Sequence, residues 1–241
     1  MDFYSRVYAR QEYLTPGAAD TMAWFVEATR PDAGSRILEV ASGKGEAACS
    51  LAARFGCRVT AVDRSLPFLE YVRGKVHDRG LADRVGLLYA DGRNLPLPDA
   101  SHDGAYCIGA PSIVGTEECL REMRRAVRPG SAVVVSDIIW RVKPEGPLGE
   151  EWGWVTTYEP RNSIDDYTAT IAACGLVVQD VRIHPRAAWE EYERPMLEVA
   201  AQARTEGDAA FADQVEEGAE LERRAVEAFW EYATFITRRP S

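Results

Sequence analysis

A chain of 241 residues is long enough for one α/β domain with elaborations and leaves little room for a second full domain. No apolar stretch approaches the ~20 residues that a membrane-spanning helix requires, which argues against a membrane protein. The formal net charge of −10 repels phosphate backbones, so nucleic acid is not an expected partner. The first residues lack the basic-then-apolar order of a secretory signal, and we therefore expect a cytoplasmic protein.

The first two thirds of the chain alternate between helical and extended patterns. Residues 3–30 predict one or two helices, interrupted by Pro16 and Gly17. Thr116 is expected to cap the helix that precedes the last strand of this part. Short apolar runs predict five strands, which alternate with helices and indicate a parallel, doubly wound sheet, at 37–41, 57–62, 84–90, 102–109 and 131–139.

The C-terminal part is less regular. Residues 140–162 are rich in tryptophan and proline and show no clear period. Ser163 and Asp166 resemble a capping box at the start of a helix that runs to Cys174. The patterns that follow predict a strand, a helical region and a final strand, at 176–184, 187–230 and 232–238.

A glycine turn follows the first strand, in the stretch ILEVASGKGEAA. Gly43 and Gly45 supply unusual backbone angles and let a ligand approach the main chain. Because Gly43, Gly45 and Ala48 also fit the spacing G-x-G-x-x-A, a dinucleotide remains one possible cofactor. The turn alone therefore leaves two cofactor classes open.

Acidic residues at the strand ends bear on that choice. Asp63, after the second strand, suits ribose hydroxyls in either cofactor class. Asp91 follows the third strand and lies beside the same crevice, where it could accept a hydrogen bond from an adenine amino group. The helices that precede the glycine turn also argue against a dinucleotide domain, which would begin at the first strand.

Four motifs in order carry a family resemblance, namely EVASGKGE, AVDRS, YADGRNLPLPDASHDGAYCIGA and LREMRRAVRPGSAVVVSDIIW. Over residues 34–140 the chain resembles class I S-adenosylmethionine-dependent methyltransferases of the ubiquinone/menaquinone-biosynthesis type. It also resembles, from end to end, a group of small bacterial methyltransferases with an aromatic-rich C-terminal region. The resemblance implies a Rossmann-like sheet of seven strands in the order 3-2-1-4-5-7-6, with strand 7 antiparallel and helices at both ends of the chain.

The resemblance also implies one methyltransferase domain over 1–241, with an N-terminal helical cap at 1–33, a cofactor-binding core at 34–140 and acceptor-side insertions at 141–241. Ala41 stands where the family usually has glycine. The cofactor carries no phosphate, so Lys44 is expected to be a solvated residue. Residues implied to line or bind the cofactor are Glu39, Ala41, Gly43, Gly45, Asp63, Arg64, Asp91, Gly92, Ile108 and Gly109.

Acceptor-side residues carry weaker signals. His184, at the end of a late strand, is a candidate base if the acceptor must lose a proton. Aromatic side chains could wall an acceptor pocket or could belong to the core. They are Trp140, Trp152, Trp154, Trp189, Tyr192 and, from the first helix, Tyr8. No cluster has the ligand spacing of a metal site, so no metal is expected.

These observations predict an S-adenosylmethionine-dependent methyltransferase that acts on a small organic acceptor and releases S-adenosylhomocysteine. The stretch IGAPS after the fourth strand lacks the signature associated with amino methylation of bases and glutamine, which favours a small acceptor. An NAD(P)-dependent oxidoreductase and a non-catalytic binding protein of the same fold remain alternatives. The chain is expected to be a monomer or a homodimer.

Overall fold

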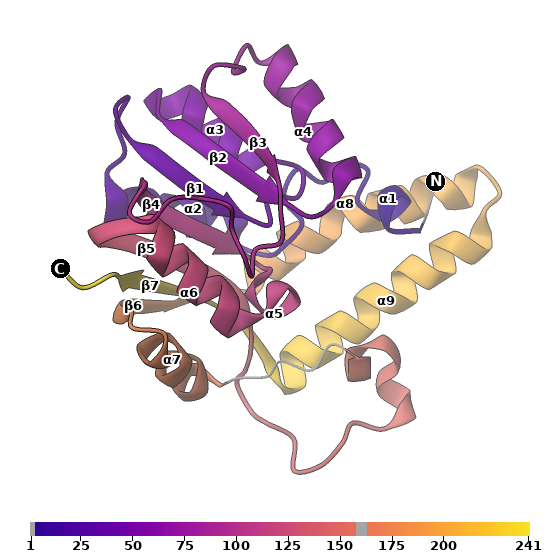
Figure 1. Cartoon of the computed structure of the whole chain (residues 1–241). Coiled ribbons are helices and arrows are strands. Elements are labelled where there is room, and N and C mark those ends of the chain that lie inside the picture. The colour runs from indigo at the N-terminus through magenta and orange to yellow at the C-terminus, as the bar shows by residue number, and fades with distance from the viewer. Residues whose placement is uncertain (1–2, 158–162) are drawn as a thin grey trace.

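One sheet organises the molecule (Figure 1). In residues 3–157 and 163–241, which the computed structural model describes, seven strands follow the order β3-β2-β1-β4-β5-β7-β6. Strands β1 to β5 are parallel, and β7 runs antiparallel to both β5 and β6. The predicted order and the antiparallel seventh strand are confirmed. The strands are β1 Arg36–Val40, β2 Arg58–Asp63, β3 Val85–Tyr89, β4 His102–Ile108, β5 Val127–Trp140, β6 Val177–Ile183 and β7 Trp230–Arg238.

Helices cover both faces of this sheet (Figure 1). In the N-terminal part they are α1 Phe3–Val7, α2 Ala18–Thr29, α3 Glu46–Phe55, α4 Leu66–Asp78, α5 Pro111–Val114 and α6 Thr116–Ala126. The C-terminal part adds a 3-10 helix η1 Glu150–Thr157, α7 Ile164–Ala173, α8 Arg186–Thr205 and α9 Ala209–Ala228. Among the described residues, no helix combines the length and the apolar character needed to cross a membrane.

The core has two layers because side chains alternate between the faces of each strand. On β5, Val133 packs into one hydrophobic cluster together with Leu120 and Met123 of α6. Its neighbour Val134 packs into the cluster on the opposite face, with Phe25 of α2. Both faces are therefore covered, which explains why the central strands are almost continuously apolar.

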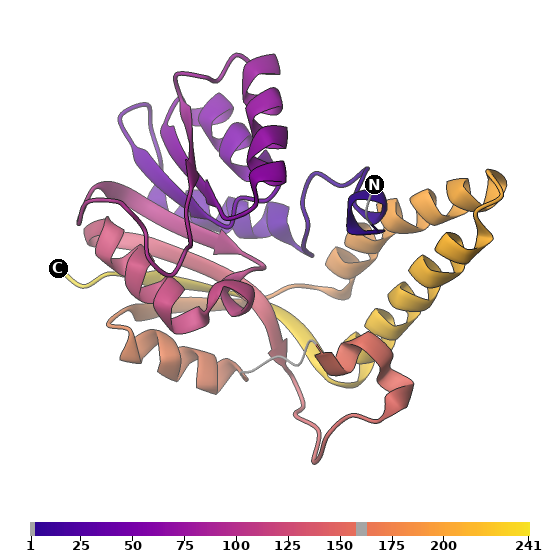
Figure 2. The ribbon, with the colours of Figure 1, turned by 45° about the vertical axis from the view of Figure 1, so that its right-hand side comes forward.

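Helices α8 and α9 form a hairpin between β6 and β7 that projects from the sheet (Figure 2). Apolar residues of the hairpin, including Met196 and Phe211, pack with Val7 of α1 in a cluster of their own. The helix α1 thus lies against α8, far from it in sequence (Figure 1). The hairpin joins the N-terminal segment and the sheet edge into one structure.

Three local predictions can be compared with the structure. The capping box is confirmed, since Ser163 Oγ accepts from Asp166 N at 3.2 Å and Asp166 Oδ2 accepts from Ser163 N at 3.2 Å. The cap at Thr116 is wrong, because Thr116 is the first helical residue and Gly115, at φ +120°, precedes it without a side-chain cap. The fifth strand begins at Val127, earlier than predicted, because Val127 pairs with His102 ahead of a register shift in β4.

Candidate active site

A cavity of about 320 Å³ lies where the carboxyl ends of the parallel strands meet the N-terminal loop, which is residues 8–17 between α1 and α2. This edge of an open α/β sheet is where ligands bind, because the strand order reverses there. The lining residues come from four strand ends, the glycine turn, the start of α4 and α5. They include nine of the residues that the sequence implied for a cofactor, namely Glu39, Ala41, Gly43, Asp63, Arg64, Asp91, Gly92, Ile108 and Gly109.

Glu39, on β1, is a buried carboxyl group at the floor of the cavity. Its Oε2 has no hydrogen-bond partner within the described chain, although it is shielded from solvent. Burial, together with the nearby charge of Asp63, raises the pKa of Glu39 to about 8. A buried oxygen without a partner is costly, so this group is suited to accept a hydrogen bond from a ligand cation.

Asp63 ties the end of β2 to the glycine turn. Its Oδ2 accepts from Gly43 N at 2.8 Å and its Oδ1 accepts from Ser65 N at 2.8 Å. Each oxygen retains a lone pair, so the carboxylate can still accept hydrogen bonds from two ligand hydroxyls. Burial raises the pKa of Asp63, and the two main-chain donors oppose that shift.

The two glycines of the turn, Gly43 and Gly45, have different roles, which their spacing in the sequence does not distinguish. Gly43 lines the cavity at φ +50°. Gly45 does not line it, and a Cβ there would lie 2.5 Å from Val72 Cγ1 of α4. Gly45 therefore lets α3 pack against α4, and its implied place in the cofactor lining needs correction.

Asp91 and Gly92 form the wall beyond β3. Arg93 donates to Asp91 from Nη2, at 2.6 Å from Oδ2, and this pairing holds the pKa of Asp91 at about 2. A Cβ on Gly92 would lie 2.7 Å from Val40 Cγ1, so only glycine lets this segment approach β1 so closely. Asp91 is therefore a fixed acceptor at one end of the cavity.

At the end of β4, Gly109 lies beneath the N-terminal loop. It adopts φ +68°, and a Cβ there would lie 2.4 Å from Thr15 Oγ1. Thr15 lines the cavity and donates to the hydroxyl of Tyr232 at 2.6 Å, and that hydroxyl lies 3.0 Å from Ser136 Oγ. This chain of hydroxyls fixes the position of Thr15 over the glycine.

The N-terminal loop covers the cavity through residues that the sequence did not single out as a group. Glu12, Tyr13, Leu14 and Thr15 all line it. Lys44 holds this loop, because its Nζ donates to the carbonyl oxygens of Tyr8 at 2.5 Å and Gln11 at 2.8 Å. The expectation that Lys44 is simply solvated is wrong, and no local signal in the sequence indicates partners more than thirty residues away.

The acceptor-side candidates lie elsewhere. None of the six aromatic residues lines this cavity. Trp140 and Trp189 belong to a hydrophobic cluster with Trp230 and Tyr232, against which Trp152 packs, while Trp154 lies 6.1 Å from the Trp230 ring. Tyr192 and Tyr8 share a contact between their hydroxyls at 3.3 Å in the α8 region. The expectation that these aromatic rings cap the crevice therefore needs correction, because five of them pack among the C-terminal elements and α1, and Trp154 is exposed away from the cavity.

His184 is also removed from the cavity. Its side chain is fully buried, with Nε2 at 2.8 Å from Thr234 Oγ1 and its ring 4.7 Å from that of Trp24. Burial lowers its pKa, so the imidazole is neutral near pH 7. The location of this ring makes it a packing and hydrogen-bonding residue, which corrects its candidacy as a base at the cavity.

The charges around the cavity are mainly acidic. Five carboxyl groups line it, against Lys44 and Arg64, and they are Glu12, Glu39, Glu46, Asp63 and Asp91. Glu46 stands in the first turn of α3, where Arg79 and Lys75 bind its carboxylate and hold its pKa at about 2. The cavity therefore favours a ligand with positive charge and disfavours a phosphate at this helix terminus.

A family model matches the part of the chain that forms most of this cavity. Residues 37–130 match the family model described as a methyltransferase domain. The matched segment, which is less than half of the chain, is therefore similar to methyltransferase domains. It contains β1 to β4, the glycine turn and nearly all of the strand-end residues of the cavity.

Curated proteins that are similar to this chain include bacterial methyltransferases. Methyltransferase GfsG of Streptomyces halstedii is 32% identical over 148 residues, which are 60% of this chain and 53% of the relative. A demethylmenaquinone methyltransferase of Clavibacter sepedonicus is 34% identical over 140 residues, which are 56% of this chain and 55% of the relative. The chain spans about half the length of the curated relatives that it matches.

Solved structures share the fold over nearly the whole chain. A methyltransferase from Thiobacillus denitrificans in complex with S-adenosyl-L-homocysteine gives a TM-score of 0.77 at 19% identity, covering 99% of this chain and 98% of that one. YjhP from Escherichia coli gives 0.78 at 20% identity, covering 98% and 99%. The fold of nearly the whole chain is thus found in other proteins.

Proposed function

We propose that this protein transfers a methyl group from S-adenosylmethionine to a small organic acceptor. One observation carries the proposal: the carboxyl groups of Glu39, Asp63 and Asp91, at the ends of three neighbouring strands, line one acidic cavity. The cofactor has an ammonium and a sulfonium but no phosphate, and an acidic cavity complements those charges. The unpartnered Oε2 of Glu39 and the cavity that Gly43, Gly92 and Gly109 help to line fit such a ligand.

In this proposal each lining residue contacts a particular part of the cofactor. Asp63 accepts hydrogen bonds from the two ribose hydroxyls, while Asp91 and the Gly92 amide bind the adenine. Glu39 accepts a hydrogen bond from the ammonium, directly or through the glycine turn. The main chain at Ile108 and Gly109 faces the amino acid moiety, and Arg64 lies alongside the nucleoside.

The protein's contribution to methyl transfer is alignment. When bound, the cofactor supplies a methyl group already activated by the positive sulfur. The loop residues Tyr13, Leu14 and Thr15 line the cavity, and in this proposal they shield the reacting groups from water. Holding two reactants in line for displacement can lower the barrier by several kcal/mol, so no general base is required for every acceptor.

A dinucleotide cofactor fits this cavity less well. The pyrophosphate of a dinucleotide is expected at the N-terminus of the first helix after the glycine turn. Glu46 occupies the first turn of that helix and is ionised at neutral pH, since its pKa lies at about 2. Lys44, the nearest cation in the turn, is already bound to main-chain oxygens.

The net charge of −10 supports a small acceptor, because it opposes binding of nucleic acid. The five buried cysteine thiols suit a reducing compartment such as the cytoplasm.

Calorimetry tests the cofactor assignment. We expect S-adenosylhomocysteine to bind and NAD⁺ not to bind. Asp63→Ala should raise the dissociation constant for S-adenosylhomocysteine at least about tenfold, because a hydrogen bond to a charged group contributes roughly 1.5–3 kcal/mol. Asp83→Ala, at an exposed position outside the cavity, serves as the control. Unchanged affinity in Asp63→Ala, or binding of NAD⁺ alone, contradicts the proposal.

Catalysis needs a separate test. The protein is incubated with S-adenosylmethionine and a panel of small alcohols, phenols, amines and thiols, and release of S-adenosylhomocysteine is measured. Release that depends on one acceptor class supports methyl transfer and identifies the atom methylated. Tight cofactor binding without release for any acceptor would support the non-catalytic alternative.

A further inference from the structure

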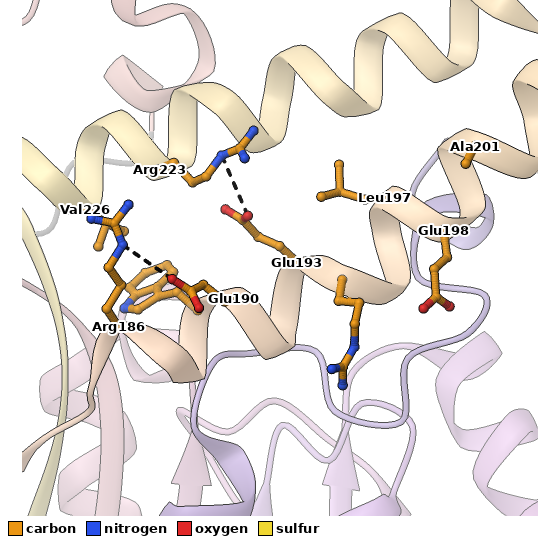
Figure 3. A pocket seen from close by; sticks show the side chains of 10 residues that line it. Arg186, Glu190, Glu193, Leu197, Glu198, Ala201, Arg223 and Val226 are labelled. Atoms are coloured by element: carbon orange, nitrogen blue, oxygen red, sulfur yellow. Dashed lines mark ion pairs between the residues drawn. The ribbon is translucent and has the colours of Figure 1, made fainter.

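A second groove, of about 600 Å³, lies between helices α8 and α9 (Figure 3). It shares no lining residue with the cavity at the strand ends. Charged side chains of both signs and several apolar groups line it. Among them are Trp189, Glu193, Leu197, Glu198, Arg223 and Val226.

Glu193 is the buried acid of this groove. Its side chain is only 5% exposed, and it points from α8 toward Arg223 of α9 (Figure 3). Its Oε1 has no hydrogen-bond partner in the described part of the chain. Its Oε2 lies 3.8 Å from Arg223 Nε, which is an ion pair but too long for a hydrogen bond. Glu193 therefore lacks the hydrogen-bond donor that a buried carboxylate needs.

Arg223 has a buried hydrogen-bond donor without an acceptor. Its Nε is buried and has no acceptor among the described residues, while its Nη2 pairs with Glu220 at 3.0 Å. The groove therefore holds one unsatisfied acceptor, Glu193 Oε1, and one unsatisfied donor, Arg223 Nε, on opposite helices. A ligand that carries both kinds of group satisfies both atoms.

The electrostatic surroundings favour a positively charged donor. Residues 186–228, which form the hairpin, contain twelve acidic and five basic side chains, so most of the net charge of the protein lies here. Three of these acids, Glu190, Glu193 and Glu198, line the groove. A cation in the groove relieves repulsion between their carboxylates.

We propose that the α8–α9 groove binds an organic ammonium that carries a hydroxyl group and an apolar body. The ammonium donates to Glu193 Oε1, and the hydroxyl oxygen accepts from Arg223 Nε. The apolar body packs against Trp189, Leu197 and Val226, where the aromatic ring also attracts the cation. This proposal does not rest on methyl transfer, because the groove and the cofactor cavity have separate linings.

Calorimetry with phenylalaninol, which has an ammonium, a hydroxyl and a phenyl group, tests the proposal. The comparison ligand is 3-phenylpropan-1-ol, which lacks the ammonium. We expect saturable binding of one phenylalaninol per chain and at least tenfold weaker binding of the alcohol. Absence of saturable binding, or equal binding of both compounds, overturns the proposal.

Substitutions of Glu193 and Arg223 test the two hydrogen bonds proposed for the ligand. Glu193→Gln should weaken phenylalaninol binding at least tenfold, and Glu191→Gln, on the same helix but outside the groove lining, should change it less than twofold. If Glu193→Gln fails to fold, Arg223→Lys keeps the positive charge, removes Nε, and should weaken phenylalaninol binding several-fold. Unchanged binding in the folded variants overturns the proposal. Affinity for S-adenosylhomocysteine, measured on the same samples, reports separately on the cofactor cavity.

Discussion

At the scale of single residues, Ala41 has a backbone conformation that alanine rarely adopts. Its φ is +57°, in the left-handed region, and it lines the cavity just before the glycine turn. For a residue with a Cβ this conformation costs roughly 1–2 kcal/mol. The departure from the glycine usual in the resembled family is therefore accommodated by local strain rather than by a different turn.

Ala41→Gly should raise the free energy of unfolding by about 0.5–1 kcal/mol, because relief of strain exceeds the added freedom of the unfolded chain. Ala53→Gly, at an exposed position in the last turn of α3, should instead lower the free energy of unfolding, by up to about 1 kcal/mol. Urea denaturation measures both. Destabilisation of the protein by Ala41→Gly would show that the left-handed turn costs nothing here.

The carboxyl group of Glu39 links stability to pH. Its pKa is about 8 in the folded protein and about 4.5 in an unfolded chain. The unfolded state therefore loses its proton first, and the free energy of unfolding should fall as pH rises from 4.5 to 8, by a few kcal/mol at most. Asp137 and Glu222, whose pKa values are also raised, act in the same direction.

Glu39→Gln should flatten this dependence, because glutamine does not titrate. Urea denaturation at pH 5, 6.5 and 8 measures the slope for both proteins. A residual slope should remain in the variant, from the other acids with raised pKa values, which include Asp63, Asp137 and Glu222. Equal slopes in the variant and the parent protein would assign the pH dependence to groups other than Glu39.

At the scale of elements, the N-terminal loop and the glycine turn depend on each other. Lys44 connects them through main-chain oxygens of residues 8 and 11. Lys75 of α4 adds a second connection, because it pairs with Glu46 at 2.9 Å and also with Glu12 of the loop. The covering of the cavity is thus held by cations on α4 and the turn.

Lys44→Met should loosen the loop while keeping the aliphatic stem of the side chain. We expect faster amide hydrogen exchange in residues 8–15 and a several-fold loss of affinity for S-adenosylhomocysteine, because the loop must then be ordered on binding. Lys143→Met, at an exposed position outside the cavity, is the matched control. Exchange in residues 8–15 that stays unchanged would mean that other contacts hold the loop.

At the scale of the whole molecule, the sheet brings the two halves of the chain to one cavity edge. Strands β1 to β4 supply the acids and the glycines, and β7 supplies Tyr232, whose hydroxyl holds Thr15 of the N-terminal loop. A ligand in the cavity therefore contacts segments that fold together with the entire sheet. Its binding should stabilise the whole chain.

S-adenosylhomocysteine at 100 times its dissociation constant should add about 2.7 kcal/mol to the free energy of unfolding. For a chain of this size, that corresponds to a rise in Tm of roughly 5–10 °C. A thermal shift assay measures the rise, with NAD⁺ at the same concentration as the comparison. A rise with NAD⁺ and none with S-adenosylhomocysteine would favour the oxidoreductase alternative.

The sequence by itself determined the features that depend on neighbouring residues. The position of Asp63 follows from the apolar strand predicted at 57–62, which ends beside it, and the same kind of pattern places Asp91 after β3. Because carboxyl ends of parallel strands share one edge, these local patterns also determined which acids meet. The strand order followed from the family resemblance.

Only the tertiary structure decided the positions that depend on distant segments. Lys44 binds the loop at residues 8–11, Gly45 accommodates Val72 of α4, and Trp189 packs with Tyr232 rather than facing the cofactor cavity. Whether a large or charged side chain lines a cavity or fills a core depends on what the rest of the chain places against it. That information lies in contacts between residues far apart in sequence, which local patterns do not encode.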